Sequence, residues 1–167
     1  NDTKKYKIRQ HLQEIQQGIN VMIYDLMQAE NNMQQQGGGS SSCPLKSLSQ
    51  AMQQMGAQQM AINMLTRELM KQLGSMGKPS YQTRMNAQRL GRDEQRLAEN
   101  LKRLLQTNSE AQKQTSAMNK IIEELEDISR DLQNNRIDQS LIDRQERILS
   151  RLLDAQKSIH KREYSRK

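Results

Sequence analysis

Residues 136–160 read RIDQSLIDRQERILSRLLDAQKSIH, and this stretch decides the fold class. Its apolar side chains are Leu141, Ile142, Ile148, Leu149, Leu152, Ala155 and Ile159. Steps of three and four residues place them on one face of an α-helix. Asp138 precedes the first of them and belongs to the residue types that cap helix N-termini. The stretch therefore predicts an amphipathic helix over residues 138–162, whose apolar face other helices must cover.

The composition of the whole chain favours helices as well. The 167 residues include 11 Met and no Phe or Trp, with only two Pro and eight Gly to interrupt them. Met, Gln, Leu, Lys, Arg and Glu are good helix formers, whereas Val, a strand former, occurs only at position 21. We expect an all-α fold, an antiparallel bundle of four or five helices with coiled-coil-like heptad seams.

A long heptad seam occupies residues 4–34. It consists of Ile8, Leu12, Ile15, Ile19, Met22, Leu26, Ala29 and Met33. The run QQQGGGSSSCP at 34–44 ends it, because three Gly and three Ser in a row favour a flexible connection. We expect a long helix within residues 1–34, a Gly/Ser linker over 35–44, and a helical bundle over 45–167 that packs with the first helix. Such a linker also permits exchange of the first helix between protomers.

The seam of the next helix, residues 45–73, is polar in its middle. Gln59 and Thr66 occupy positions where the heptad pattern calls for apolar residues. One explanation is a polar layer that sets the register of the helices. The other is a small rotation of the helix that brings Met60, Met64 and Leu65 inward, and we favour the rotation.

Three further breaks divide the remaining sequence. In GSMGKPS, residues 74–80, Gly74 is a candidate C-cap and Ser80 a candidate N-cap. The third helix is expected over 81–106, with Asp93 and Glu94 interrupting its apolar stripe. Residues 106–110 are the best candidate for a turn, with Asn108 or Ser109 capping a helix over 110–133, although one continuous helix over 81–133 also fits. Asn134 and Asn135 then tolerate a left-handed helix end.

The net charge of +7 permits an anionic partner such as nucleic acid or a membrane surface. Arginines gather in the third helix at positions 84, 89, 92, 96 and 103, and we expect them to spread over several faces. Nucleic-acid binding would favour one stripe with a stacking aromatic, and only Tyr81 is close. The single cysteine, Cys43, excludes an intramolecular disulfide, and no apolar run is long enough to span a bilayer.

The sequence offers no convincing constellation for chemistry. His11 and His160 lie near opposite ends and lack the Glu-x-x-His spacing of di-iron bundles. The methionines at 52, 55, 60, 64, 70 and 76 are better read as core filler than as a soft-metal site. We therefore expect a protein that is not an enzyme, with no catalytic residue, metal or cofactor. The chain begins at Asn1 without a recognisable signal peptide, which suggests a processed chain or part of a longer protein.

The charges of residues 136–160 outnumber what solubility requires. We predict that a neighbouring helix or a partner contacts them, and the candidate partner-contact residues are Arg144, Arg147, Arg151, Asp154 and Lys157.

Residues 142–167, IDRQERILSRLLDAQKSIHKREYSRK, with the lead-in NNRIDQSL, resemble the tail of large bacterial membrane-anchored proteins that carry a domain of unknown function. The resemblance covers about residues 134–167 and, by character alone, the Gln- and Met-rich part. It implies an extended helical protein with an upstream membrane anchor, on an undetermined side of the membrane. It brings no activity, and marks only Arg144-Gln145 and 150–156 as packing or partner-contact positions.

These observations lead to two hypotheses about function. The first is a structural or protein–protein interaction module, a helical scaffold in a membrane-associated bacterial assembly, whose partners are other subunits or a second copy. The alternative is a basic helical nucleic-acid-binding protein.

Overall fold

The computed structural model describes residue 4 and residues 44–165 of the chain. Its long helices are α2 (Pro44–Met76), α3 (Tyr81–Thr107), α5 (Thr115–Gln133) and α6 (Gln139–Ser165), with a single turn, α4 (Ser109–Gln112), between α3 and α5. All of them belong to one unit, residues 41–167. The helix expected over 4–34 and the linker expected over 35–44 lie outside the described residues, apart from Lys4 and Pro44.

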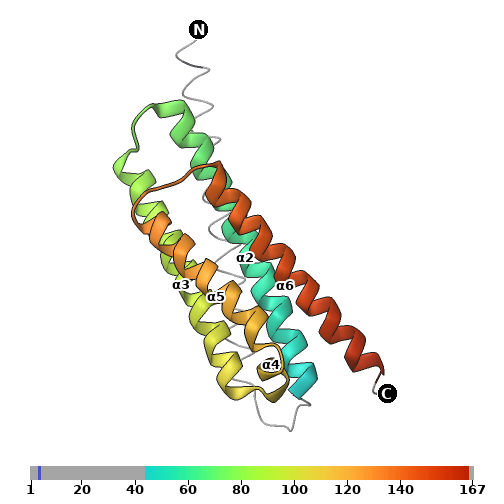
Figure 1. The fold of residues 1–167 in the computed structure, drawn as a ribbon. Coiled ribbons are helices and arrows are strands. Elements are labelled where there is room, and N and C mark those ends of the chain that lie inside the picture. Colours follow the sequence, from blue (N-terminus) through green and yellow to red (C-terminus); the bar gives the residue numbers. More distant parts are fainter. Residues whose placement is uncertain (1–3, 5–43, 166–167) are drawn as a thin grey trace. The chain divides into compact units, whose positions relative to one another are not determined.

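The four long helices alternate in direction along the chain (Figure 1). Helix α3 packs mainly on α5, and α2 packs mainly on α6; α2 also contacts α3, and α5 also contacts α6. Within residues 44–165, each long helix therefore has two long neighbours, and α3 and α6 face each other diagonally. This arrangement confirms the all-α antiparallel bundle.

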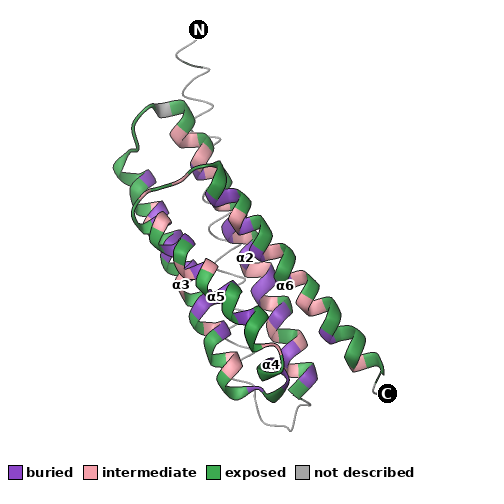
Figure 2. Cartoon of the chain, viewed as in Figure 1, coloured by how far each residue is buried: buried purple, intermediate pink, exposed green. Residues whose placement is uncertain are grey.

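The inner faces of these helices carry the buried residues (Figure 2). Among the largest fully buried side chains are Leu45, Leu48, Met52, Ile62, Leu101, Met118, Leu125, Ile128, Leu132, Leu141, Ile148 and Leu152. On α6, Leu141, Ile148, Leu152 and Ile159 are all buried, as the spacing of the opening stretch predicts. The apolar periodicity therefore identified the core face of this helix correctly.

Most predicted helix ends are confirmed. The Ser80 hydroxyl accepts a hydrogen bond from the Thr83 N–H, and Asp138 Oδ1 accepts one from the Leu141 N–H at 2.9 Å. Asn135 adopts φ +56°, the left-handed conformation expected after α5. Gly74 is a correction: it lies within α2, and the left-handed residue is Gly77 at φ +69°. The helix continues past Gly74 because helical backbone is compatible with Gly, and Pro79 follows only after Gly77.

Residues 81–133 form separate helices and not one continuous helix, and the helix expected over 110–133 is divided into α4 and α5. Asn108 Oδ1 accepts hydrogen bonds from the backbone N–H groups of Glu110 and Ala111, which caps α4. Its Nδ2 donates to the Pro44 carbonyl at 2.9 Å, at the first residue of α2. Asn108 is buried and joins the end of α3 to the start of α2.

Helices α3 and α5 approach each other closely at Gly91. A Cβ atom at this position would lie 2.9 Å from the Ser129 carbonyl oxygen and 2.6 Å from Gln133 Cγ. Ser129 Oγ also donates a hydrogen bond to the Gly91 carbonyl at 2.7 Å. The absence of a side chain at Gly91 therefore allows the two backbones to meet.

Candidate functional site

A layer of polar side chains crosses the middle of the core. Gln59, Asn63 and Thr66 come from α2, Glu94 from α3 and Gln145 from α6, and all five are buried. The rotation expected for α2 is therefore wrong: Met60 and Met64 remain 48% and 56% exposed, while Gln59 and Thr66 are fully buried. The polar residues stay inward because partners on α3 and α6 satisfy much of their hydrogen-bonding capacity, which removes the penalty that a rotation would have relieved.

The hydrogen bonds of the layer converge on one carboxylate oxygen. Gln59 Nε2 donates to Glu94 Oε1 at 2.9 Å, and Gln145 Nε2 donates to the same oxygen at 2.8 Å. Gln59 also donates to Asn63 Oδ1, and Gln145 to Thr66 Oγ1. Asn63 Nδ2 in turn donates to the Gln145 carbonyl at 3.2 Å. Side-chain hydrogen bonds thus connect both α2 and α6 to α3. Helices α2 and α6 are also joined to each other, by one bond between side chains and one from a side chain to the backbone.

The layer has more acceptors than donors. Both N–H bonds of each glutamine amide are used, and the Thr66 hydroxyl donates to the Ile62 carbonyl. Among the described residues, Glu94 Oε2, Gln59 Oε1 and Gln145 Oε1 have no hydrogen-bond donor. A proton on the Glu94 carboxyl would add the missing donor.

The electrostatics of the site favour that proton. Burial raises the pKa of Glu94 from 4.5 to about 7 by removing the carboxylate from water. The hydrogen bonds from Gln59 and Gln145 oppose this rise, and the neighbouring charge of Asp93 adds to it. Glu94 is therefore protonated in the folded bundle below about pH 7, and its charge changes close to neutral pH.

Asp93 and Glu94 do not interrupt the inner face of α3, contrary to expectation, because both are buried. Asp93 Oδ1 lies 3.3 Å from Nη1 of the exposed Arg96, and the positive charge of Arg96 compensates the carboxylate. From the sequence alone, charged residues within an apolar stripe look like an interruption of that stripe. Here the partners of Glu94 come from residues 35 and 51 positions away, which periodicity within one helix does not reveal.

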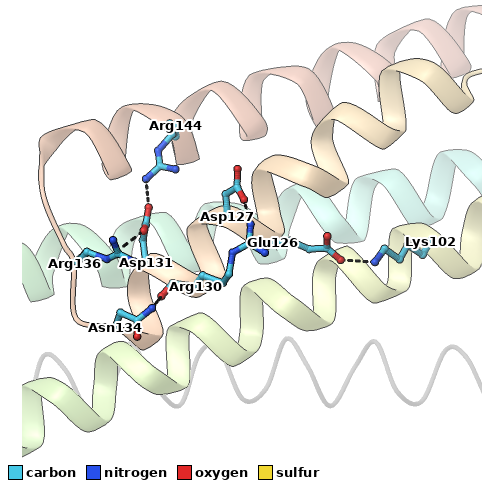
Figure 3. Close-up of polar contacts among 8 residues, drawn as sticks. All are labelled: Lys102, Glu126, Asp127, Arg130, Asp131, Asn134, Arg136 and Arg144. Atoms are coloured by element: carbon cyan, nitrogen blue, oxygen red, sulfur yellow. Dashed lines mark hydrogen bonds and ion pairs between the residues drawn. The ribbon is translucent and has the colours of Figure 1, made fainter.

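Two of the five candidate partner-contact residues form ion pairs with α5. Arg144 pairs with Asp131, which also lies 3.6 Å from Arg136 Nε (Figure 3). Arg151 Nη1 lies 2.9 Å from Glu124 Oε2. Arg147, Asp154 and Lys157 are exposed on α6. The expected contact with a neighbouring helix is thus present for Arg144 and Arg151, and contact of any of the five with a partner stays a prediction.

Arg151 and Asp154 also line an open depression between the first turns of α5 and the second half of α6. Met118 and Ile121 supply part of its apolar wall, and Lys120 adds a charge. This is the place where the structure brings two of the sequence-derived candidates together.

The methionines divide into two groups. Met52 and Met55 are buried, as core filler should be, whereas Met60 and Met64 lie on the solvent face of α2. Met70 is half-buried, and nothing is described for the side chain of Met76. Within residues 44–165, no group of three or more His, Cys, Asp or Glu side chains is placed to hold a metal ion. In the same residues no helix is long and apolar enough to cross a membrane.

The arginines of α3 also differ from what the sequence was expected to give. Arg89, Arg92, Arg96 and Arg103 are all exposed, and at 3.6 residues per turn they fall within an arc of about 60°. Only Arg84 lies on a different side. The expected spread over several faces is therefore wrong for four of the five.

No family model matches the chain, and neither the curated proteins nor the solved structures contain a significant match.

Proposed function

We propose that residues 44–165 act as a rigid helical interaction module that binds an amphipathic helix of another protein. One observation carries this proposal: Met60 and Met64, one turn apart on α2, present about half of their surfaces to solvent. Large apolar side chains gathered on one exposed face mark sites of protein association. Methionine suits such a surface because its unbranched, polarisable side chain adapts to different partners.

The charges around this methionine pair indicate the chemistry of the partner. Lys46 and Lys71 are exposed on the same side of α2 as the methionines. Lys46 precedes Met60 and Lys71 follows Met64, each at a distance of about two turns or more. A helix that places apolar residues on Met60 and Met64 and acidic residues toward the lysines is complementary to this face.

The interior supports the role of a scaffold. A hydrogen-bonded polar layer tying three helices together favours one register of the bundle over slipped alternatives. A fixed register keeps the exposed face of α2 constant, which lowers the cost of binding. Membrane association of the larger assembly rests on the resemblance of residues 134–167 alone.

The test uses the full chain with a photo-crosslinking residue at position 60, in cells that produce it naturally. We expect a crosslinked protein whose binding is confirmed by light scattering of the purified pair. Met60→Gln with Met64→Gln removes the apolar surface while keeping side-chain length and helix propensity, and should abolish the complex. Asn119→Gln with Glu123→Gln on the exposed side of α5 is the matched control and should bind normally. A chain that stays monomeric and crosslinks to nothing at position 60 contradicts the proposal.

A further inference from the structure

One exposed face of α3 combines cations with an aromatic ring. Arg89, Arg92, Arg96 and Arg103 share it with Tyr81 and Met85, which are 71% and 38% exposed. At 100° per residue the six positions fall within an arc of about 80°. We call this set the arginine stripe.

The arginine stripe lies opposite the buried side of its helix. Leu90, Leu97 and Leu101 are buried and point into the bundle. From Arg89 to Arg103 the stripe extends about 21 Å at 1.5 Å per residue. A rigid, fully packed helix therefore holds four guanidinium groups in a row on its outer side.

Neighbouring polar groups orient some of these arginines, and all four stay exposed. Arg96 Nη1 lies 3.3 Å from the buried Asp93, and Arg103 Nη2 donates to Asn100 Oδ1 at 2.8 Å. The exposed acid along this side of α3 is Glu99, which accepts from Gln95 at 3.4 Å. The stripe thus retains an excess of positive charge, in a chain whose net charge is +7.

The residue types indicate a phosphate-bearing strand. The guanidinium group is a planar fork of donors that binds phosphate oxygens in pairs, which ammonium groups do not. A row of them can follow successive phosphates, and an exposed tyrosine at one end can stack on an unpaired base. A lipid surface fits less well, because membrane-surface helices insert an apolar face, and the apolar face of α3 is buried in the bundle.

We propose that the arginine stripe of α3 is a binding surface for single-stranded nucleic acid, with the four arginines on successive phosphates and Tyr81 stacked on a base. The surface lies on a different helix from Met60 and Met64, so it stands independently of the proposed protein partner.

The experiment is a fluorescence-anisotropy titration of the full chain with a labelled single-stranded 20-mer over a range of salt concentrations. We expect binding that weakens as salt rises, because bound cations displace counterions from the strand. Arg92→Ala with Arg103→Ala should lower the affinity about tenfold and reduce the salt slope by about 0.7 for each arginine removed. Tyr81→Ala should lower the affinity about fivefold or more without changing that slope.

The matched control is Lys161→Ala with Arg162→Ala, which removes the same charge from exposed positions on α6. It should bind nearly as well as the original chain. An equal loss in the control, or no binding at low salt, overturns the proposal. Equal affinity for a duplex of the same sequence, or for phosphatidylglycerol vesicles independently of Tyr81, also overturns it in favour of a general anionic surface. Circular dichroism verifies that each variant is folded.

Discussion

Gln145 Nε2 of α6 lies 2.8 Å from Glu94 Oε1 of α3, which joins two helices that stand diagonally across the bundle. Neither helix supplies the other with a main packing face, and this hydrogen bond joins them directly across the core. Gln59 of α2 donates to the same oxygen at 2.9 Å. One buried carboxyl group therefore ties three helices together.

The stability of the bundle should decrease as the pH rises from 4.5 to 7. Folding raises the pKa of Glu94 from 4.5 to about 7, so in this window the folded state holds a proton that the unfolded state releases. Raising the pH then favours unfolding, by about 3 kcal/mol in total at 1.36 kcal/mol per pKa unit. Urea unfolding of the original chain and of Glu94→Gln, followed by circular dichroism, measures the difference.

The side chain at position 94 cannot titrate in Glu94→Gln, so this variant should lack the pH-dependent part of the free energy of unfolding. Glu99→Gln, an exposed change on the same helix, should retain it. A difference between the original chain and Glu94→Gln that is constant from pH 4.5 to 8 would show that the buried carboxyl is not protonated in the fold.

Breaking the polar layer should cost more than replacing it. Gln145→Leu removes the donor to Glu94 and to Thr66 and leaves both buried, which should destabilise the fold by about 1–3 kcal/mol. The triple variant Gln59→Leu, Glu94→Leu and Gln145→Leu should recover most of that loss, because it replaces the carboxyl group together with both of its donors. Asn63 and Thr66 keep their hydrogen bonds to the backbone carbonyls of residue 145 and Ile62. Chemical unfolding of the single and triple variants tests this non-additivity. If the triple variant loses the sum of the single losses, the layer is a net source of stability.

Gly91→Ala should destabilise the bundle by about 2–3 kcal/mol, because its Cβ would lie 2.9 Å from the Ser129 carbonyl oxygen. The α3 and α5 backbones would have to separate, which also weakens the hydrogen bond from Ser129 to the Gly91 carbonyl. Gly74→Ala is the matched control. Nothing lies within 4 Å of a Cβ there, and the change should raise stability by up to about 1 kcal/mol through helix propensity. Thermal unfolding separates the two, and similar melting temperatures would argue against close α3–α5 contact.

Asn108→Ala should destabilise the fold by about 2 kcal/mol, since it removes the cap of α4 and the donor to the Pro44 carbonyl. Hydrogen exchange should show the largest loss of protection in α4 and the first turn of α2. Asn119→Ala, at an exposed position inside α5, serves as the comparison and should change little. Unchanged protection of α2 in Asn108→Ala would mean that the contact with Pro44 does not form in solution.

Arg144→Ala and Arg147→Ala should differ in their effects on stability. The Arg144 and Asp131 side chains are only 25% and 24% exposed, so their ion pair is partly shielded from water and should contribute about 1 kcal/mol. Arg147 is exposed on α6, and its loss should leave the free energy of unfolding within about 0.5 kcal/mol. Denaturant unfolding compares the two. If Asp131→Asn reproduces the Arg144→Ala loss and the double variant loses no more, the pair is the cause.

The sequence by itself determined the fold class and most helix boundaries. Apolar spacing on residues 136–160 identified the buried face of α6, and Ser80, Asp138 and Asn135 marked helix ends. These features depend on residues within a few positions of one another, so local propensity and periodicity are enough to find them.

Tertiary structure alone decided how the polar positions are used. Gln59, Thr66, Asp93 and Glu94 looked like defects in their stripes, and two of them satisfy each other only because α2, α3 and α6 meet at one level. The inward side of α2 and the close approach at Gly91 likewise depend on which neighbour each helix meets. A single helix does not encode its neighbours, because burial and hydrogen bonding between helices arise from residues distant in sequence.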